Sequence, residues 1–68
     1  MSAKGDTIIY YEVSPLLHGG LSEFSFTYSS ESEVPIGSFV TVPFGRRSSL
    51  GIVMRSVAKP DFKTKPIT

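Results

Sequence analysis

The sequence predicts a mainly β fold, a small curled antiparallel sheet or partial barrel of the SH3-like or OB-like kind with about four to five strands. Four segments alternate apolar and polar residues with the two-residue period of a half-buried strand, and none carries the apolar stripe of an amphipathic helix. Prolines and glycines separate these segments. Two hairpin-like pairs of strands in 68 residues can bury their apolar faces only by curling over one another.

The first two expected strands cover residues 7–13 and 24–28 and are joined by a glycine-containing connection. The first is rich in β-branched and aromatic residues, and we expect the pair Ser14-Pro15 to end it. In the second, three aromatic residues alternate with serine and threonine, so one face is aromatic and should turn inward. The rings on that face belong to Phe24, Phe26 and Tyr28.

The other two expected strands, residues 38–44 and 50–57, form a hairpin through the loop 45–49. The run Val34-Pro35-Ile36-Gly37 leads into the hairpin and suits a type I turn, with proline in second place and glycine in fourth. Pro43 has no amide hydrogen to donate, which places its strand at a sheet edge or at a bulge. We expect the chain after the hairpin to be extended.

Length and composition limit what the chain can be. A chain of 68 residues holds one domain, so we expect residues 1–68 to fold as a unit that buries about 60% of its unfolded surface. The absence of cysteine excludes a disulfide framework and a thiolate zinc site. No apolar run reaches the roughly 18 residues of a membrane-spanning helix, so we expect a cytoplasmic protein with no membrane partner.

Charge is divided unevenly along the chain, although the net charge is only +1. Residues 1–33 carry one lysine against five acidic side chains, whereas residues 34–68 carry six basic side chains against one acidic one. This division favours one face for a polyanion such as nucleic acid, with an ordinary mixed surface as the alternative.

The residue patterns of catalysis are missing, so we expect no enzymatic activity of this chain alone, no catalytic residue, and no metal or other cofactor. The glycines punctuate strands and do not form a phosphate-cradling loop that ends in Gly-Lys-Ser/Thr. His18 is the single histidine, and without cysteines it lacks partners for a metal site or an activated nucleophile. Glu31 and Glu33 lie in a turn-rich stretch, where solvated charge is the expected role.

Two features suit nucleic acid. The hairpin tip Gly45-Arg46-Arg47 offers two guanidinium groups for phosphates or bases, beside a glycine that lets a ligand approach the backbone. An exposed ring from residues 24–28 would be a stacking platform for a base. The alternatives are a tip that only adds solubility and rings that all belong to the core.

The elements Phe26-Thr27-Tyr28, Pro43-Phe44-Gly45-Arg46-Arg47 and Gly51-Ile52-Val53, with Gly37 between the first two, resemble the N-terminal 3′-DNA-binding domain of the PriA family of primosomal replication-restart helicases. The resemblance covers residues 10–67, and its Val-Pro-Phe-Gly and Gly-Ile-Val elements are fairly specific. It implies an accessory domain of a bacterial ATP-dependent 3′-to-5′ helicase, which captures the 3′ end of a nascent strand at a replication fork. The implied partners are DNA, the remainder of the helicase and other primosome proteins.

The resemblance also implies a pocket for the terminal nucleotide. Phe26 matches the stacking aromatic, Gly45 the glycine that the nucleotide approaches, and Lys65 the pocket lysine, with Lys63 as the alternative. Thr27 stands where family members commonly carry aspartate, and its uncharged hydroxyl leaves selectivity for a free 3′-OH open. The expected nucleic-acid-binding residues are Phe26, Thr27, Gly45, Arg46, Arg47 and Lys65.

Two other functions stay open at this point. Gly-x-x-Val-x-Val followed by Gly-x-Val also suits an SH3-like barrel of the KOW or ribosomal type, which would bind RNA or a protein. The third possibility is a structural adaptor whose arginine tip docks on an acidic surface of another domain.

Overall fold

The computed structural model describes residues 8–17, 20–21 and 24–67, and within them the chain forms strands and connections without a helix. No helix of the described part is therefore long and apolar enough to cross a membrane. The strands are β1 (Ile9–Leu17), β2 (Gly20–Leu21), β3 (Phe26–Ser30), β4 (Phe39–Phe44), β5 (Arg47–Val57) and β6 (Lys65–Pro66).

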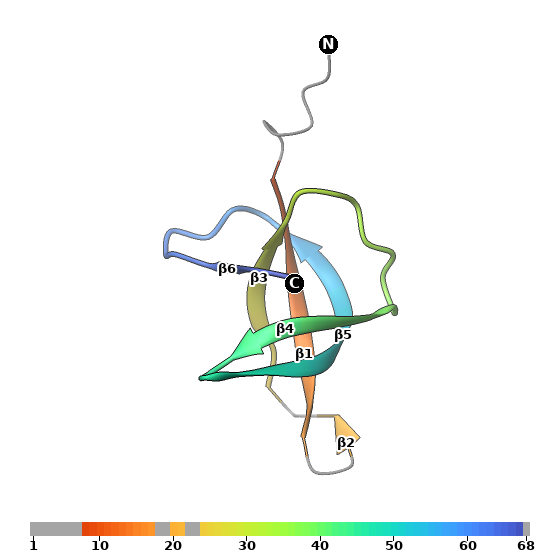
Figure 1. Cartoon of the computed structure of the whole chain (residues 1–68). Coiled ribbons are helices and arrows are strands. Elements are labelled where there is room, and N and C mark those ends of the chain that lie inside the picture. The colour runs from red at the N-terminus through yellow and green to blue at the C-terminus, as the bar shows by residue number, and fades with distance from the viewer. Residues whose placement is uncertain (1–7, 18–19, 22–23, 68) are drawn as a thin grey trace.

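The strands form one curled sheet in the order β4-β5-β1-β3-β6, and β2 pairs with the end of β1 (Figure 1). All neighbours are antiparallel except β3 and β6, which run parallel. The result is a half-barrel, so the prediction of a mainly β, partly closed barrel is confirmed. The tail was expected only to be extended, and the parallel strand that it adds makes the sheet mixed.

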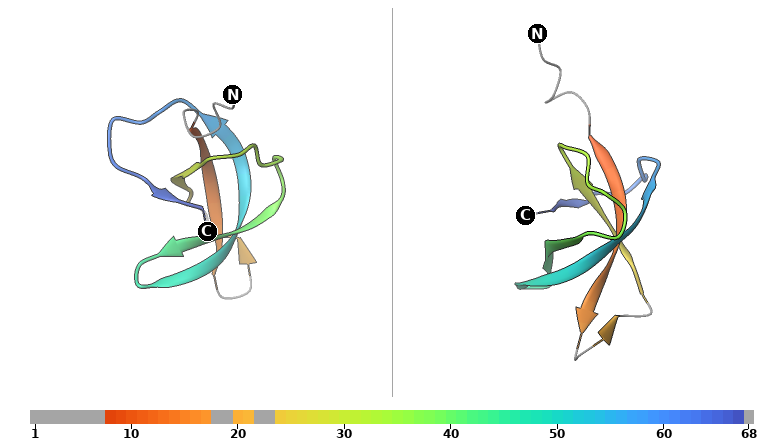
Figure 2. Two further views of the ribbon diagram at one scale, coloured as in Figure 1. Left: turned by 45° about the horizontal axis from the view of Figure 1, so that its top comes forward. Right: turned by 90° about the vertical axis from the view of Figure 1, so that its right-hand side faces the viewer.

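The curl of the sheet is concentrated in β5, which curves strongly as it passes from β4 to β1 (Figure 2). The pairing of β1 with β5 shifts between Glu12 and Val13, leaving Met54 as an extra residue, and such a bulge bends its strand. Close approach also needs Gly51, because a Cβ there would lie 2.7 Å from the Val13 Cγ1 atom.

The expected end of the first strand at Ser14-Pro15 is wrong, because β1 continues to Leu17. Pro15 is fully buried and lies opposite Gly51 of β5. Pairing with β3 stops at Val13, so Pro15 lies beyond the part of β1 where that neighbour would need its amide hydrogen.

Both predicted turns form, with different geometry. The amide of Ser38 donates to the Pro35 carbonyl at 3.2 Å, so the first turn covers residues 35–38 and Gly37 occupies its third position. The φ of +91° at Gly37 fits a type II turn rather than the predicted type I turn. The hairpin loop contains two residues, Gly45 and Arg46, instead of five. A φ of +64° at its first position is typical of the primed turns, types I′ and II′, which match the twist of the flanking strands. The edge position predicted for β4 from its proline is confirmed.

The core is small and draws on four strands. Its buried members are Tyr11, Val13, Tyr28, Val42 and Val53. The three valines are completely inaccessible to solvent, and Ile9, Val34, Val40 and Ile67 pack around them. The alternating faces predicted for the first and third strands are those that face this core.

Two tyrosine hydroxyls attach neighbouring segments to the core. The Tyr11 hydroxyl accepts a hydrogen bond from the Val34 amide at 2.9 Å, which fixes the connection between β3 and β4. The Tyr28 hydroxyl donates to the Pro43 carbonyl at 2.9 Å, which joins β3 to β4 although the two are not neighbours in the sheet. Burial raises the pKa of Tyr28 above 10.0, so the hydroxyl stays protonated and able to donate.

We expect Tyr28→Phe to lower the free energy of unfolding by about 1 kcal/mol, because the phenyl ring keeps the packing but leaves the Pro43 carbonyl without its donor. Urea denaturation followed by circular dichroism measures this change. Tyr10→Phe is the matched control, since its side chain points to the opposite face of β1 and its hydroxyl makes no hydrogen bond within the described residues.

The raised pKa supplies a separate readout, for the burial of the Tyr28 hydroxyl. The folded protein holds the Tyr28 proton more tightly than the unfolded chain, so this stabilisation is complete below about pH 10 and is lost as the pH rises through the folded pKa. Stability above that pH should fall more steeply in the parent protein than in Tyr28→Phe. Equal stabilities at neutral pH would contradict the role of the hydrogen bond, and equal slopes at high pH would contradict the burial of the hydroxyl.

Candidate nucleic-acid interface

The main candidate site is a cleft of about 450 Å³ between three segments that lie far apart in the sequence. The segments are the start of β3, the end of β4 with the hairpin glycine, and the residues just before β6. β6 and the β4–β5 hairpin extend to the same side of the molecule in both views of Figure 2. The cleft is lined by Ser25, Phe26, Thr27, Tyr28, Pro43, Phe44, Gly45, Phe62, Lys63, Thr64 and Lys65.

The closure of the half-barrel forms this cleft. Besides the Tyr28 hydrogen bond, the rings of Phe26 and Phe44 meet edge to face, with centroids 5.5 Å apart and planes at 62°. On the other side of β3, Lys65 pairs with Tyr28 in a parallel register that the bond from the Ile67 amide to the Ser29 carbonyl extends, at 2.9 Å. The cleft therefore has one wall on β4 and another on the chain leading into β6.

The aromatic residues of the second predicted strand do not share one environment. Tyr28 is 5% exposed and belongs to the core, whereas Phe26 is 43% and Phe24 69% exposed. The expectation that all three rings turn inward is thus wrong for two of them. The reason is that β3 pairs with β1 only from Phe26 onward, so this ring lies at the rim, against Phe44 and beside the cleft.

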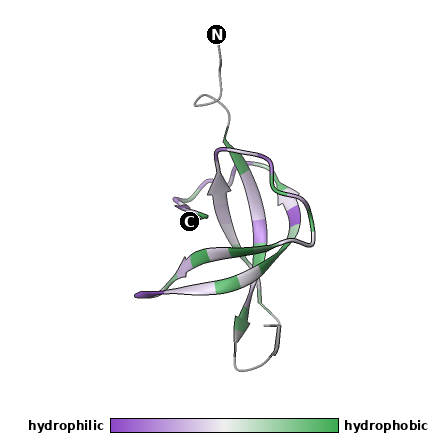
Figure 3. Ribbon diagram, turned by 45° about the vertical axis from the view of Figure 1, so that its right-hand side comes forward, coloured by the Kyte–Doolittle hydropathy of each residue, from purple (hydrophilic) through white to green (hydrophobic). Residues whose placement is uncertain are grey.

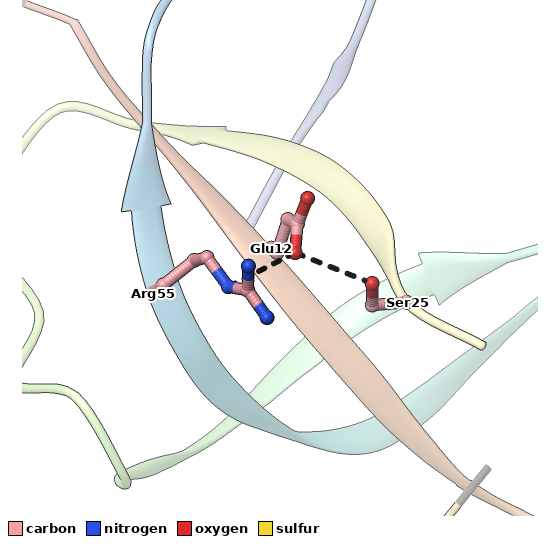
Figure 4. Close-up of polar contacts among 3 residues, drawn as sticks. All are labelled: Glu12, Ser25 and Arg55. Carbon is pink, nitrogen blue, oxygen red and sulfur yellow. Dashed lines mark hydrogen bonds and ion pairs between the residues drawn. The ribbon is translucent and has the colours of Figure 1, made fainter. Parts of the chain in front are cut away.

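Ser25, immediately before β3, is bound by a side chain on the outer face of the sheet. The Glu12 carboxylate lies 3.3 Å from the Arg55 Nε atom and accepts a hydrogen bond from the Ser25 hydroxyl at 3.5 Å (Figure 4). The guanidinium of Arg55 is largely exposed, so the ion pair adds little stability. These contacts engage Arg55 on the face of β1 away from the core.

Gly45 lines the cleft at the hairpin turn. Its positive φ explains the glycine, and a Cβ atom placed there would meet nothing within 4 Å, so the space beside this backbone is open to a ligand. Arg46 and Arg47 follow it and are exposed at the hydrophilic tip of the hairpin (Figure 3), but neither lines the cleft. These two arginines therefore lie next to the cleft in the chain but are not among the residues that line it.

The remaining predicted site residues also meet here. Thr27 is half-buried in the cleft, and the exposed Lys63 and Lys65 both line the opposite wall, so position alone does not choose between them. His18 lies outside the described residues. Sequence reasoning missed Phe62, which is 61% exposed and lines the cleft next to Lys63. The available signal was a lone aromatic residue among lysines in the tail that was expected to be extended.

Comparison with known proteins gives one informative result. A search of curated proteins and a search of solved structures each found no match. A family model described as the 3′DNA-binding domain (3′BD) of PriA matches residues 16–68, well over half of the chain, and this range holds every predicted site residue. The matched family is a DNA-binding domain and not a catalytic one. The chain belongs to the PriA 3′ DNA-binding domain family.

Proposed function

We propose that this DNA-binding domain recognises the 3′ end of a nascent strand at a replication fork, as the N-terminal part of a longer replication-restart helicase. One observation carries the proposal: the cleft brings a half-exposed ring, an open glycine turn and two lysines together. Other primosome proteins are further proposed partners of the whole helicase.

We expect the cleft to take a strand end in preference to a continuous strand. The Phe26 and Phe44 rings, with the Tyr28 hydrogen bond, join β3 to β4 beside the cleft, and this closure is expected to limit the passage of a strand between them. The terminal base would stack on the exposed part of Phe26. The sugar would then lie near the backbone of Gly45, where no side chain intervenes.

Charge near the cleft suits the phosphates of the same strand. Lys63 and Lys65 line one wall, and Arg46 and Arg47 project from the hairpin beside the other. Cationic side chains of this kind bind phosphates without reading sequence, which is what a domain that recognises any 3′ end requires.

We expect Phe26→Ala to weaken binding of a single strand with a free 3′ end by about 1–3 kcal/mol, because the base loses its stacking partner. Fluorescence anisotropy with a 5′-labelled oligonucleotide measures the Kd. Phe24→Ala is the matched control, since Phe24 precedes the same strand, is more exposed and does not line the cleft. Equal losses in the two variants, or an unfolded Phe26→Ala protein, would remove the stacking role.

Selectivity for the terminal hydroxyl is expected to depend on Thr27, the polar cleft residue next to the stacking ring. A neutral hydroxyl gives a weaker hydrogen bond than a carboxylate, so the parent protein should prefer a 3′-hydroxyl over a 3′-phosphate only modestly. Thr27→Asp should raise that preference by about tenfold, through a stronger bond to the hydroxyl and repulsion of the phosphate.

Paired titrations of oligonucleotides that differ only at the 3′ end test this expectation. Thr27→Val, which keeps the shape and removes the hydroxyl, is the control. If the parent and both variants bind the two ends equally well, end recognition is wrong while DNA binding itself stands.

The hairpin arginines should contribute mainly through charge. Replacing Arg46 and Arg47 by alanine should reduce the slope of log K against log salt by about 1.4 for a single strand, or about 0.7 for each phosphate that an arginine no longer neutralises. Arg55→Ala, which removes one positive charge where the double variant removes two, is the control, because Arg55 pairs with Glu12 on the outer face of the sheet. An unchanged slope in the double variant, or an equal change in the control, would show that the tip does not bind DNA.

A further inference from the structure

We infer that the cleft binds two consecutive nucleotides, and that Phe62 stacks on the base that precedes the terminal one. This inference rests on the proposed binding of a 3′ end and extends it to a second base site. It concerns a residue in the connection between β5 and β6, outside the strands that form the core.

Phe62 is an exposed aromatic side chain in the cleft, as expected of a residue that binds a ligand. Its side chain is 61% exposed and lies outside the core cluster and outside the ring pair of Phe26 and Phe44. Of the large exposed apolar side chains in the described part of the chain, only Phe26 and Phe62 line the cleft. A free ring in a cleft lined by cations suits a ligand with flat apolar surfaces and an anionic backbone.

The register of β6 places Phe62 near Phe26. Tyr28 and Lys65 pair in parallel; Phe26 precedes Tyr28 by two residues on β3, and Phe62 precedes Lys65 by three residues in the connection that leads into β6. Both rings therefore reach the cleft from corresponding ends of adjacent segments. Because no ring contact joins them in the described structure, each ring can serve a separate base.

The difference in exposure assigns an order to the two bases. Phe26 is the inner ring, 43% exposed and packed against Phe44, whereas Phe62 is 61% exposed. We therefore place the terminal base on Phe26 and the preceding base on the more open ring of Phe62. The phosphate between the two bases would then lie along the wall of Lys63 and Lys65, which directly follow Phe62 in the chain.

A double-mutant cycle between the protein and the DNA tests this assignment. Short single strands are prepared in five forms: intact with a free 3′ end, abasic at the terminal position, abasic at the penultimate position, abasic at the fourth position from the end, and intact with a 3′-phosphate. Each is titrated against the parent domain and against Phe62→Ala. Phe62→Leu keeps apolar bulk without an aromatic face, and circular dichroism checks that both variants fold.

In the parent, loss of the penultimate base should weaken binding by about 5- to 140-fold, the range expected for one stacked base. Phe62→Ala should weaken binding of the intact strand to a similar extent, and the penultimate abasic strand should then bind both proteins almost equally. Phe62→Leu should behave like the alanine variant, and the abasic fourth position should change little.

Other outcomes overturn the inference in distinguishable ways. An equal penalty for the penultimate abasic strand in parent and variant would show that Phe62 does not stack on that base. Coupling of Phe62→Ala to an abasic terminal position would mean that both rings sandwich a single base. If a 3′-phosphate has no effect on the parent while coupling to the penultimate base is absent, end binding itself fails; if the phosphate still weakens binding, the second base site alone is wrong.

Discussion

The hydrogen bond from the Tyr28 hydroxyl to the Pro43 carbonyl is the contact on which the cleft depends. β1 and β5 separate β3 from β4 in the sheet, so no ladder of backbone bonds holds these two strands together. The bulge and Gly51 curl the sheet, and the tyrosine, with Phe26 against Phe44, fixes the distance between the walls that the curl creates. Burial favours the neutral hydroxyl, so the donor persists at neutral pH. The cleft is therefore a product of barrel closure and not of any single loop.

The fold could be predicted where the signal is local. Alternation defined the face of β4 that carries Val42, and the missing amide hydrogen of Pro43 correctly placed that strand at an edge. Features that depend on a distant partner could not be predicted. Pro15 has the local character of a strand terminator, yet β1 continues because Gly51 of β5 lies opposite it. The tail carries no strand pattern, and β6 exists because two residues find an open edge of β3.

The contrast between local signals and features that depend on a distant partner also explains how much of the site could be predicted. Four predicted residues, Phe26, Thr27, Gly45 and Lys65, line one cleft, which the residues alone could not establish and the family resemblance implied. The arginine tip lies beside the cleft, because the loop is a two-residue turn and β5 begins early. Phe62 was missed since its importance comes from where β6 docks, and a single aromatic in a polar connection carries no periodicity. Family membership now favours DNA over the RNA- or protein-binding barrel that the glycine and valine spacing also allowed.

Among the described residues, Tyr28 is the one member of the buried core that also lines the cleft. The positions that make this domain foldable and those that give it a ligand preference are thus almost separate sets. Phe62, the threonine and the lysines could be exchanged at little cost to folding, so ligand preference can change while the scaffold stays the same. Tyr28 is the exception, because a substitution there would change the lining of the cleft and the buried core together.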